Sequence, residues 1–233
     1  MWGNLAAVRE HTATTILLIR HGRTAWNEQR IFRGRADVPL SPEGSRQAAA
    51  LAERLADDAL SAVYTSPLSR ARVTAEHIAK VHALEVLPGC AGCCAAPRDL
   101  EGLCDIGYGA WEGIPEAQVE ERWPDLYAKW RSAPHLVRPP GGETLAEVRE
   151  RALGALGEIA ARHSGSTLAA VSHRVVNKVL LCAALGLGDD AFWRIRQDTA
   201  CLNALTSENG RLAVVLMNDT CHLRGLEKDA SDF

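Results

Sequence analysis

A short apolar run near the N-terminus ends in an arginine and a histidine, and this pairing constrains the fold more than any other feature. Residues 14–19 (T-T-I-L-L-I) have the pattern of a buried strand, and Arg20 and His21 follow at its carboxyl end. Residues 167–172 form a second strand-like run, which places His173 directly before a helical stretch. Open α/β sheets bind ligands at the carboxyl ends of their strands, so the two histidines can meet in one crevice.

Strand-like and helical patterns alternate along most of the chain, which favours an α/β fold. The alternation predicts a three-layer α/β/α sandwich whose central sheet is mostly parallel and is covered by helices on both faces. Residues 88–113 are rich in Gly, Pro and Cys and are predicted to be irregular. Besides the two strands already named, the patterns predict strands over 62–65, 201–206 and 212–217, helices that begin at 41 and 66, and helices over 115–130 (broken at Pro124), 143–163 and 174–185.

The length and composition fit one large domain. The chain has 233 residues, of which 47% are hydrophobic, enough for a substantial core. We expect a single domain over 13–222 with loose tails at 1–12 and 223–233. The formal charge of -3 argues against bulk binding to nucleic acid or to an anionic membrane. No apolar stretch reaches the ~20 residues that span a bilayer, and the first residues lack a secretory pattern, so we expect a cytoplasmic protein.

The cysteines do not form the pattern of a disulfide framework. There are seven, an odd number, in a chain of ordinary domain size. Cys90, Cys93 and Cys94 form C-A-G-C-C, a spacing that thiolate metal sites use. A structural zinc site needs four ligands, but no second C-x-x-C or H-x-x-H pair follows, and Cys104 is only the nearest possible fourth ligand. An exposed loop is therefore the favoured interpretation, and no metal site is predicted.

The residues beside the first histidine suit chemistry on phosphorus. A neutral imidazole is a nucleophile that can form a covalent phosphoenzyme. The guanidinium of arginine pairs in a bidentate manner with phosphate oxygens, and Arg20 stands next to His21. Arg70 follows Ser66-Pro67 and falls in the first turn of a predicted helix, where backbone N–H groups also favour an anion.

Five segments carry these residues in a recognisable order. They are R-H-G-R-T-A-W-N at 20–27, F-R-G-R-A-D-V-P-L-S-P-E-G at 32–44, S-P-L-S-R-A at 66–71, Y-G-A-W-E-G at 108–113 and V-S-H at 171–173. In these segments the chain resembles the histidine phosphatase superfamily, which includes the cofactor-dependent phosphoglycerate mutases and their phosphatase relatives. The resemblance extends over most of the chain and implies a phosphoglycerate mutase-like fold.

The resemblance also implies roles for individual residues. It identifies His21 as the phosphorylated nucleophile, and Arg20, Arg70 and His173 as the phosphate pocket. Asn27 would be a further polar contact to the phosphate. His173 would be an electrostatic and hydrogen-bonding partner of the phosphoryl oxygens. Catalysis of this kind is expected to need neither a metal ion nor another cofactor.

The leaving group needs a proton, so a carboxylic acid is expected to face the nucleophile across the phosphate. The resemblance implies an acid four residues before the first Gly of the G-A-W-E-G stretch, where relatives generally have Glu. That position is Asp105 here, and Glu101 lies one helical turn earlier. Asp105 is favoured by the count, and Glu101 stays open as the alternative.

Three arginines stand where relatives often have other residues. They are Arg23, in place of a frequent Glu, Arg33, in place of a frequent Gln, and Arg174, in place of a common Gly. If they line the mouth of the crevice with Arg35, the site would favour a substrate with an additional negative charge. The alternative is that they are ordinary surface arginines.

The favoured function is a phosphomonoesterase that hydrolyses a small phosphorylated metabolite through a phosphohistidine. A phosphoglycerate mutase is the first alternative, since it would use the same pocket but exclude water. The stretch Y-G-A-W-E-G departs from the mutases and favours the phosphatase. A catalytically idle phosphate-binding protein is less favoured because both histidines and both arginines of the pocket are present. The residues do not identify the substrate. A homodimer is a possible assembly.

Overall fold

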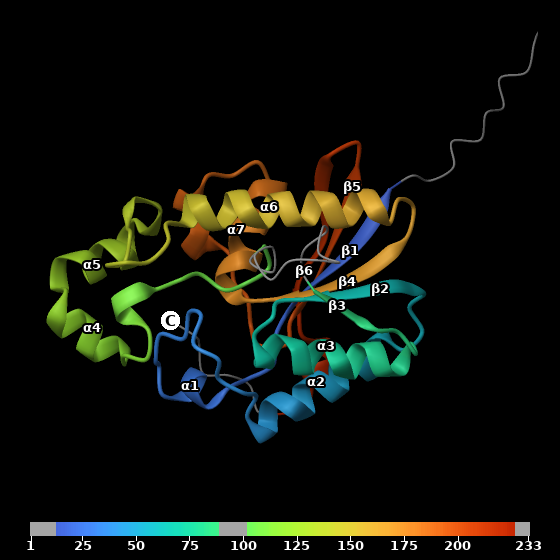
Figure 1. Ribbon diagram of the computed structural model, residues 1–233, viewed down its shortest axis with the longest axis horizontal. Helices are drawn as coiled ribbons and strands as arrows, with labels where there is room; N and C mark the ends of the chain where they lie inside the picture. Colours follow the sequence, from blue (N-terminus) through green and yellow to red (C-terminus); the bar gives the residue numbers. More distant parts are fainter. Residues whose placement is uncertain (1–12, 89–101, 227–233) are drawn as a thin grey trace, which may run out of the picture.

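The computed structural model describes residues 13–88 and 102–226 (Figure 1). Within these residues, six strands form one sheet in the order β3-β2-β4-β1-β5-β6. The strands are β1 (Thr14–Arg20), β2 (Leu60–Thr65), β3 (Val86–Pro88), β4 (Thr167–Ser172), β5 (Leu202–Glu208) and β6 (Arg211–Asp219).

The sheet is mostly parallel, as the sequence predicts. β1 pairs in parallel with β4, β4 with β2, and β2 with β3, whereas β5 runs antiparallel to both β1 and β6. In the pairing of β1 with β4, Arg20 lies opposite Ser172. The residues that follow these two strands therefore leave the sheet at the same edge, side by side.

Helices cover both faces of the sheet, which confirms the three-layer arrangement (Figure 1). α2 and α3 lie on one face, and α6 and α7 lie on the other. The helices are α1 (Ala25–Glu28), α2 (Pro42–Leu55), α3 (Ser69–Val81), α4 (Glu116–Arg122), α5 (Pro124–Ser132), α6 (Leu145–Arg162) and α7 (Arg174–Ala184).

The apolar run of β1 has no polar face because both of its faces are buried. Ile16 and Leu18 pack in the cluster that includes α6 and α7. Leu17 and Ile19 pack in the cluster that includes α2 and α3. A strand inside a parallel sheet needs apolar side chains at every position, and this need explains the unbroken T-T-I-L-L-I pattern.

Local signals in the sequence set the helix starts. Ser41 accepts a hydrogen bond from the backbone N–H of Gly44 at 3.1 Å, and Pro42 occupies the first turn of α2. Thr144 and Glu147 form a capping box at the start of α6. Pro124 ends α4 and begins α5, so the predicted break in the helical stretch after 115 is confirmed.

The α4–α5 excursion packs onto the body of the protein through aromatic rings. Trp111 and Trp130 are buried, with their ring centroids 6.1 Å apart and their planes nearly perpendicular. Trp130 also meets Trp193 edge-on at 5.9 Å. Such edge-to-face pairs add to the free energy of burying the rings. These tryptophans therefore hold the excursion in place.

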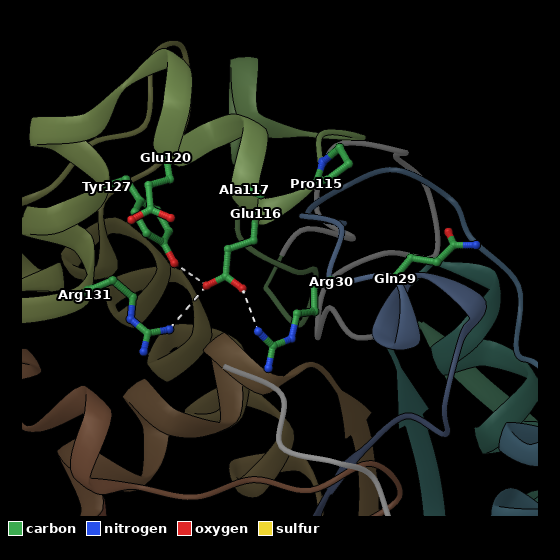
Figure 2. A pocket seen from close by; sticks show the side chains of 8 residues that line it. All are labelled: Gln29, Arg30, Pro115, Glu116, Ala117, Glu120, Tyr127 and Arg131. Atoms are coloured by element: carbon green, nitrogen blue, oxygen red, sulfur yellow. Dashed lines mark hydrogen bonds and ion pairs between the residues drawn. The ribbon is translucent and has the colours of Figure 1, made fainter.

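A polar cluster joins the excursion to the loop that follows α1 (Figure 2). Glu116 accepts hydrogen bonds from the hydroxyl of Tyr127 and, at 3.3 Å, from Arg131. Its other oxygen lies 3.7 Å from Arg30, and the strand-like bridge from Ile31 to Pro115 lies beside it. Burial and the contact with Glu116 raise the pKa of Tyr127 to about 12. These side chains line a pocket of about 540 Å³.

Two short elements were not predicted, α1 and β3, because four and three residues are too few to show a periodic pattern. Leu223, placed at the start of the expected C-terminal tail, is the last residue of a 3-10 turn and is buried. The C-A-G-C-C segment with Cys90, Cys93 and Cys94 lies outside the described residues, as does Glu101.

Candidate active site

The two histidines from the strand ends meet, as the sequence predicts. His21 follows β1, and its backbone N–H donates to the carbonyl of Ser172 at 3.0 Å. His173 follows β4 and is the residue before α7. Their ring centroids are 5.1 Å apart, and both side chains are buried.

The backbone orients the ring of His21. Its Nδ1 lies 2.6 Å from the carbonyl oxygen of Gly22. A carbonyl oxygen can only accept a hydrogen bond, so Nδ1 of the neutral ring carries the proton and Nε2 keeps its lone pair. Burial lowers the pKa of His21 well below 6.5, and the charges of Arg70, Arg20 and Arg33 add to this effect. His21 is therefore a neutral imidazole near neutral pH.

The glycine after His21 is required by a close approach of two backbone segments. A Cβ atom on Gly22 would lie 2.5 Å from the carbonyl oxygen of Gly44 in α2. The N–H of Gly22 donates to the hydroxyl of Thr74 at 3.2 Å, and that hydroxyl donates to the carbonyl of Arg70 at 2.8 Å. These contacts join the loop of His21 to the first turns of α2 and α3.

Two fully buried arginines add positive charge beside His21. Arg70 lies in the first turn of α3, as predicted, and donates to the carbonyls of Gly34 at 2.7 Å and Ala36 at 2.8 Å. Arg20 donates to the carbonyl of Gln197 at 2.7 Å. Neutral carbonyls anchor both guanidinium groups, and Arg70 also donates to Oδ2 of Asp105 at 3.3 Å.

Asp105 lies next to Arg70 and His173. Its Oδ2 is 3.3 Å from Nη2 of Arg70 and 3.7 Å from Nδ1 of His173. Its Oδ1 accepts from the backbone N–H of Ile106 at 3.0 Å. The structure thus brings Asp105 into the same pocket as both histidines.

Asn27 and Arg23 each have partners in or next to α1. Oδ1 of Asn27 accepts from the backbone N–H and the hydroxyl of Thr24, at 2.8 and 2.9 Å, so this oxygen caps the helix. Nε of Arg23 lies 3.3 Å from Glu28. A contact from Asn27 to phosphate would therefore use its amide NH₂ group.

Arg33 and Arg174 are buried, unlike ordinary surface arginines. The charge of Arg33 lowers the pKa of both His21 and His173, so it acts inside the pocket. Arg174 begins α7 next to Tyr108, whose pKa burial raises to about 12 against the opposing charge of Arg174. Arg35, by contrast, pairs with Glu143 at 3.3 Å.

Sequence reasoning missed an arginine that holds the loop of Asp105. Arg151, on α6, donates to the carbonyls of Cys104 at 2.7 Å and Asp105 at 3.0 Å. It also donates to Glu143 at 2.9 Å, and Glu143 accepts from the backbone N–H of Gly107 at 2.7 Å. An arginine in an amphipathic helix gives no local signal of such a role.

Sequence reasoning also missed Ser66. Its hydroxyl oxygen lies 2.7 Å from Nε2 of His173. The available signal was its place at the head of S-P-L-S-R-A, the segment that carries Arg70.

The family model described as the histidine phosphatase superfamily (branch 1) matches residues 16–220. The chain belongs to this family. It is accordingly a phosphoric monoester hydrolase, and the predicted family and fold are confirmed.

Individual relatives agree with this assignment. The chain is 34% identical over 208 residues to "Phosphoserine phosphatase 1" of Hydrogenobacter thermophilus, with 89% of this chain and 93% of the relative covered. It is 36% identical over 214 residues to the "Bifunctional protein Rv2228c" of Mycobacterium tuberculosis; the match covers 91% of this chain but only 56% of that longer protein. The solved structure of Bacillus stearothermophilus YhfR superposes with a TM-score of 0.82 at 32% identity, with 90% of this chain and 99% of that chain covered.

Residues 13–88 and 102–226 lack two kinds of feature. They contain no helix that is long and apolar enough to cross a membrane. They also contain no group of three or more His, Cys, Asp and Glu side chains arranged to hold a metal ion.

Proposed function

We propose that this phosphatase hydrolyses a small phosphorylated metabolite through a phosphohistidine at His21. The observation that carries the proposal is the hydrogen bond between Nδ1 of His21 and the carbonyl of Gly22. It leaves the lone pair of Nε2 available, and the lowered pKa keeps the ring neutral. Arg20 and Arg70 supply the positive charge that a transferring phosphoryl group requires.

In the first step, Nε2 of His21 attacks phosphorus. The bond from nitrogen to phosphorus forms, the ester bond from phosphorus to oxygen breaks, and the leaving oxygen takes a proton from the carboxylic acid of Asp105. In the second step, water attacks phosphorus and gives one proton to the Asp105 carboxylate. The phosphohistidine bond breaks, so phosphate leaves and neutral His21 and protonated Asp105 are restored.

We further propose that the preferred substrate carries a second negative charge near its phosphate. Arg33 and Arg174 are buried, and the charge of Arg33 acts on both histidines. Relatives named as phosphoserine phosphatases support a substrate of this kind, because phosphoserine has a carboxylate. A second such relative, the "Metal-independent phosphoserine phosphatase" of Arabidopsis thaliana, is 33% identical over 168 residues, which are 70% of this chain and 66% of that protein. The proposed reaction likewise uses no metal ion.

The test is phosphate release from phosphoserine, phosphoethanolamine and 3-phosphoglycerate, with a chelator present and with His21→Ala as control. Phosphoserine and phosphoethanolamine differ only in the carboxylate. We expect chelator-resistant release that is lost in the control, and a kcat/KM at least about tenfold higher for phosphoserine, the effect of one charge-assisted contact. Equal kcat/KM values for phosphoserine and phosphoethanolamine would contradict the proposed preference for a second negative charge on the substrate. Isomerisation of phosphoglycerate without release of phosphate would identify the protein as a mutase. No turnover of any kind would identify it as an idle phosphate-binding protein.

A further inference from the structure

Ser66 connects the carboxyl ends of two neighbouring strands, β2 and β4, next to His173. It follows β2, and its backbone N–H donates to the carbonyl of Val171 in β4 at 3.0 Å. Its side chain has no exposed surface, and its hydroxyl oxygen lies 2.7 Å from Nε2 of His173. This contact lies on the side of the imidazole ring away from Asp105, which faces Nδ1.

The direction of this hydrogen bond follows from the other neighbour of the hydroxyl. The backbone N–H of Leu68 donates to the oxygen of Ser66 at 3.4 Å. Within the described residues, Leu68 N–H and His173 Nε2 are the hydrogen-bonding neighbours of this oxygen. Because the first can only donate, the hydroxyl proton has a single acceptor, Nε2 of His173. Nε2 is therefore unprotonated, and the proton of the neutral ring resides on Nδ1.

The two histidines consequently differ in the ring nitrogen that is available to the phosphate: it is unprotonated in His21 and protonated in His173. Nδ1 of His21 lies 2.6 Å from the carbonyl oxygen of Gly22 and carries the proton of the neutral ring, so its Nε2 is unprotonated. Nδ1 of His173 lies 3.7 Å from Oδ2 of Asp105, and it carries the proton of the neutral ring because Nε2 accepts from Ser66. One ring can thus act as nucleophile while the other donates a hydrogen bond. With the proton on Nε2 instead, the lone pair of Nδ1 would face the phosphate oxygens of a bound substrate, which is repulsive.

We propose that Ser66 is a positioning residue that fixes His173 in the tautomer protonated on Nδ1, so that His173 donates a hydrogen bond to the phosphoryl group. This inference rests on the proposed function, because it gives His173 a role on a phosphate. The tautomer itself can be measured without any turnover. A hydrogen bond donated to the unprotonated nitrogen also favours the neutral form of the ring over the charged one.

The direct test is NMR of the protein labelled with ¹⁵N in its histidines, near neutral pH. Long-range proton–nitrogen correlations distinguish a protonated ring nitrogen from an unprotonated one, and a His173→Asn variant assigns the signals of that ring. We expect Nδ1 of His173 to be protonated in the unaltered protein. In Ser66→Ala, which removes the hydroxyl and little volume, we expect Nε2 to gain proton occupancy.

Activity measurements on the same variants complete the test. We expect Ser66→Ala to lower kcat/KM about tenfold, because it leaves a buried acceptor without its donor. Ser66→Thr restores a hydroxyl and should recover most of that loss. Thr65→Val is the matched control: it removes the adjacent hydroxyl, which donates to the carbonyl of Ser66 at 3.0 Å, without touching His173. The control should keep both the tautomer and the kcat/KM of the unaltered protein.

A His173 ring protonated on Nε2 in the unaltered protein would overturn the inference. So would an unchanged Nδ1–H tautomer in Ser66→Ala, whatever its activity, since the loss would then be structural. Absence of phosphate release by the unaltered protein would refute the proposed function instead, and the nitrogen signals would still decide the tautomer.

Discussion

At the scale of single residues, burial and positive charge act on the two histidines in the same direction. Both side chains are buried, and the desolvation of each ring is the largest cause of its lowered pKa. The charge of Arg70 is the second cause in both cases. The pocket therefore stabilises an anion and neutral imidazoles together, and it disfavours imidazolium.

This arrangement predicts how stability depends on pH. Unfolded histidines bind protons below pH ~6.5, whereas the buried rings do not, so the unfolded state binds more protons and stability falls as pH decreases below ~6.5. Each histidine should contribute a slope of up to about 1.4 kcal/mol per pH unit in that window. Urea titrations from pH 7.5 to 5 should show a flatter dependence for the double variant His21→Asn/His173→Asn than for the control His77→Asn in α3. An equal dependence of unfolding free energy on pH in these two variants would contradict the proposed effect of the two buried histidines.

The carboxyl group of Asp105 has a role that depends on the leaving group. Asp105→Asn should lower kcat/KM on phosphoserine by about 100-fold or more, the usual contribution of a general acid. It should lower kcat/KM on p-nitrophenyl phosphate much less, because this constant reports the transfer to His21 and nitrophenolate leaves in that step without a proton. The control is Asp58→Asn, which removes a carboxylate that lies 3.7 Å from Arg54 on the surface. Equal losses on the two substrates would exclude Asp105 as the acid and direct attention to Glu101.

At the scale of elements, α6 holds the loop of the acid from the far side. Arg151 donates to the carbonyls of Cys104 and Asp105, while Glu143, just before the helix, accepts from Gly107. The guanidinium group reaches several carbonyls in fixed directions, which an ammonium group cannot do. The position of Asp105 thus depends on contacts from α6 and from the residue before it to the backbone of the Asp105 loop.

Arg151→Lys tests this dependence. It keeps the charge but loses the planar set of N–H donors, so kcat/KM on phosphoserine should fall about tenfold, with a smaller effect on p-nitrophenyl phosphate. Arg149→Lys is the matched control on the same helix, where Arg149 pairs with Asp189 at 3.0 Å. A loss in Arg151→Lys that is equal for both substrates would show a general structural defect rather than misplacement of the acid.

At the scale of the whole molecule, the central sheet is buried on both faces. Leu17 and Leu18, adjacent in β1, pack in different hydrophobic clusters on opposite sides. Replacing either with Ala should lower the free energy of unfolding by about 2–5 kcal/mol, the usual cost of a cavity. The control Val215→Ala, at a position 66% exposed in β6, should change it by less than about 0.5 kcal/mol. Urea denaturation measures all three, and a large loss at only one leucine would contradict a doubly covered sheet.

The sequence predicted the main features of the sheet and part of the pocket. The apolar run of β1 and the pairing of strand-end histidines predicted the sheet and the meeting of His21 with His173, because strand direction fixes where their ends lie. Ser66 and Arg151 could not be predicted as partners of the pocket. Ser66 reaches a histidine 107 positions away, and Arg151 reaches the Asp105 carbonyl 46 positions away, contacts that depend on the tertiary arrangement. α1 and β3 were too short to leave a periodic signal.

In the proposed reaction the phosphoryl group passes through His21. The most direct measurement is to mix the protein with phosphoserine, stop the reaction within milliseconds, and examine the chain by mass spectrometry under conditions that preserve phosphohistidine. We predict one added phosphoryl group, located on the peptide that contains His21, absent from His21→Ala, and removed as phosphate is released. Turnover with no phosphoryl group on His21, or a phosphoryl group that stays on His21 after the substrate is exhausted, would contradict a phosphohistidine intermediate.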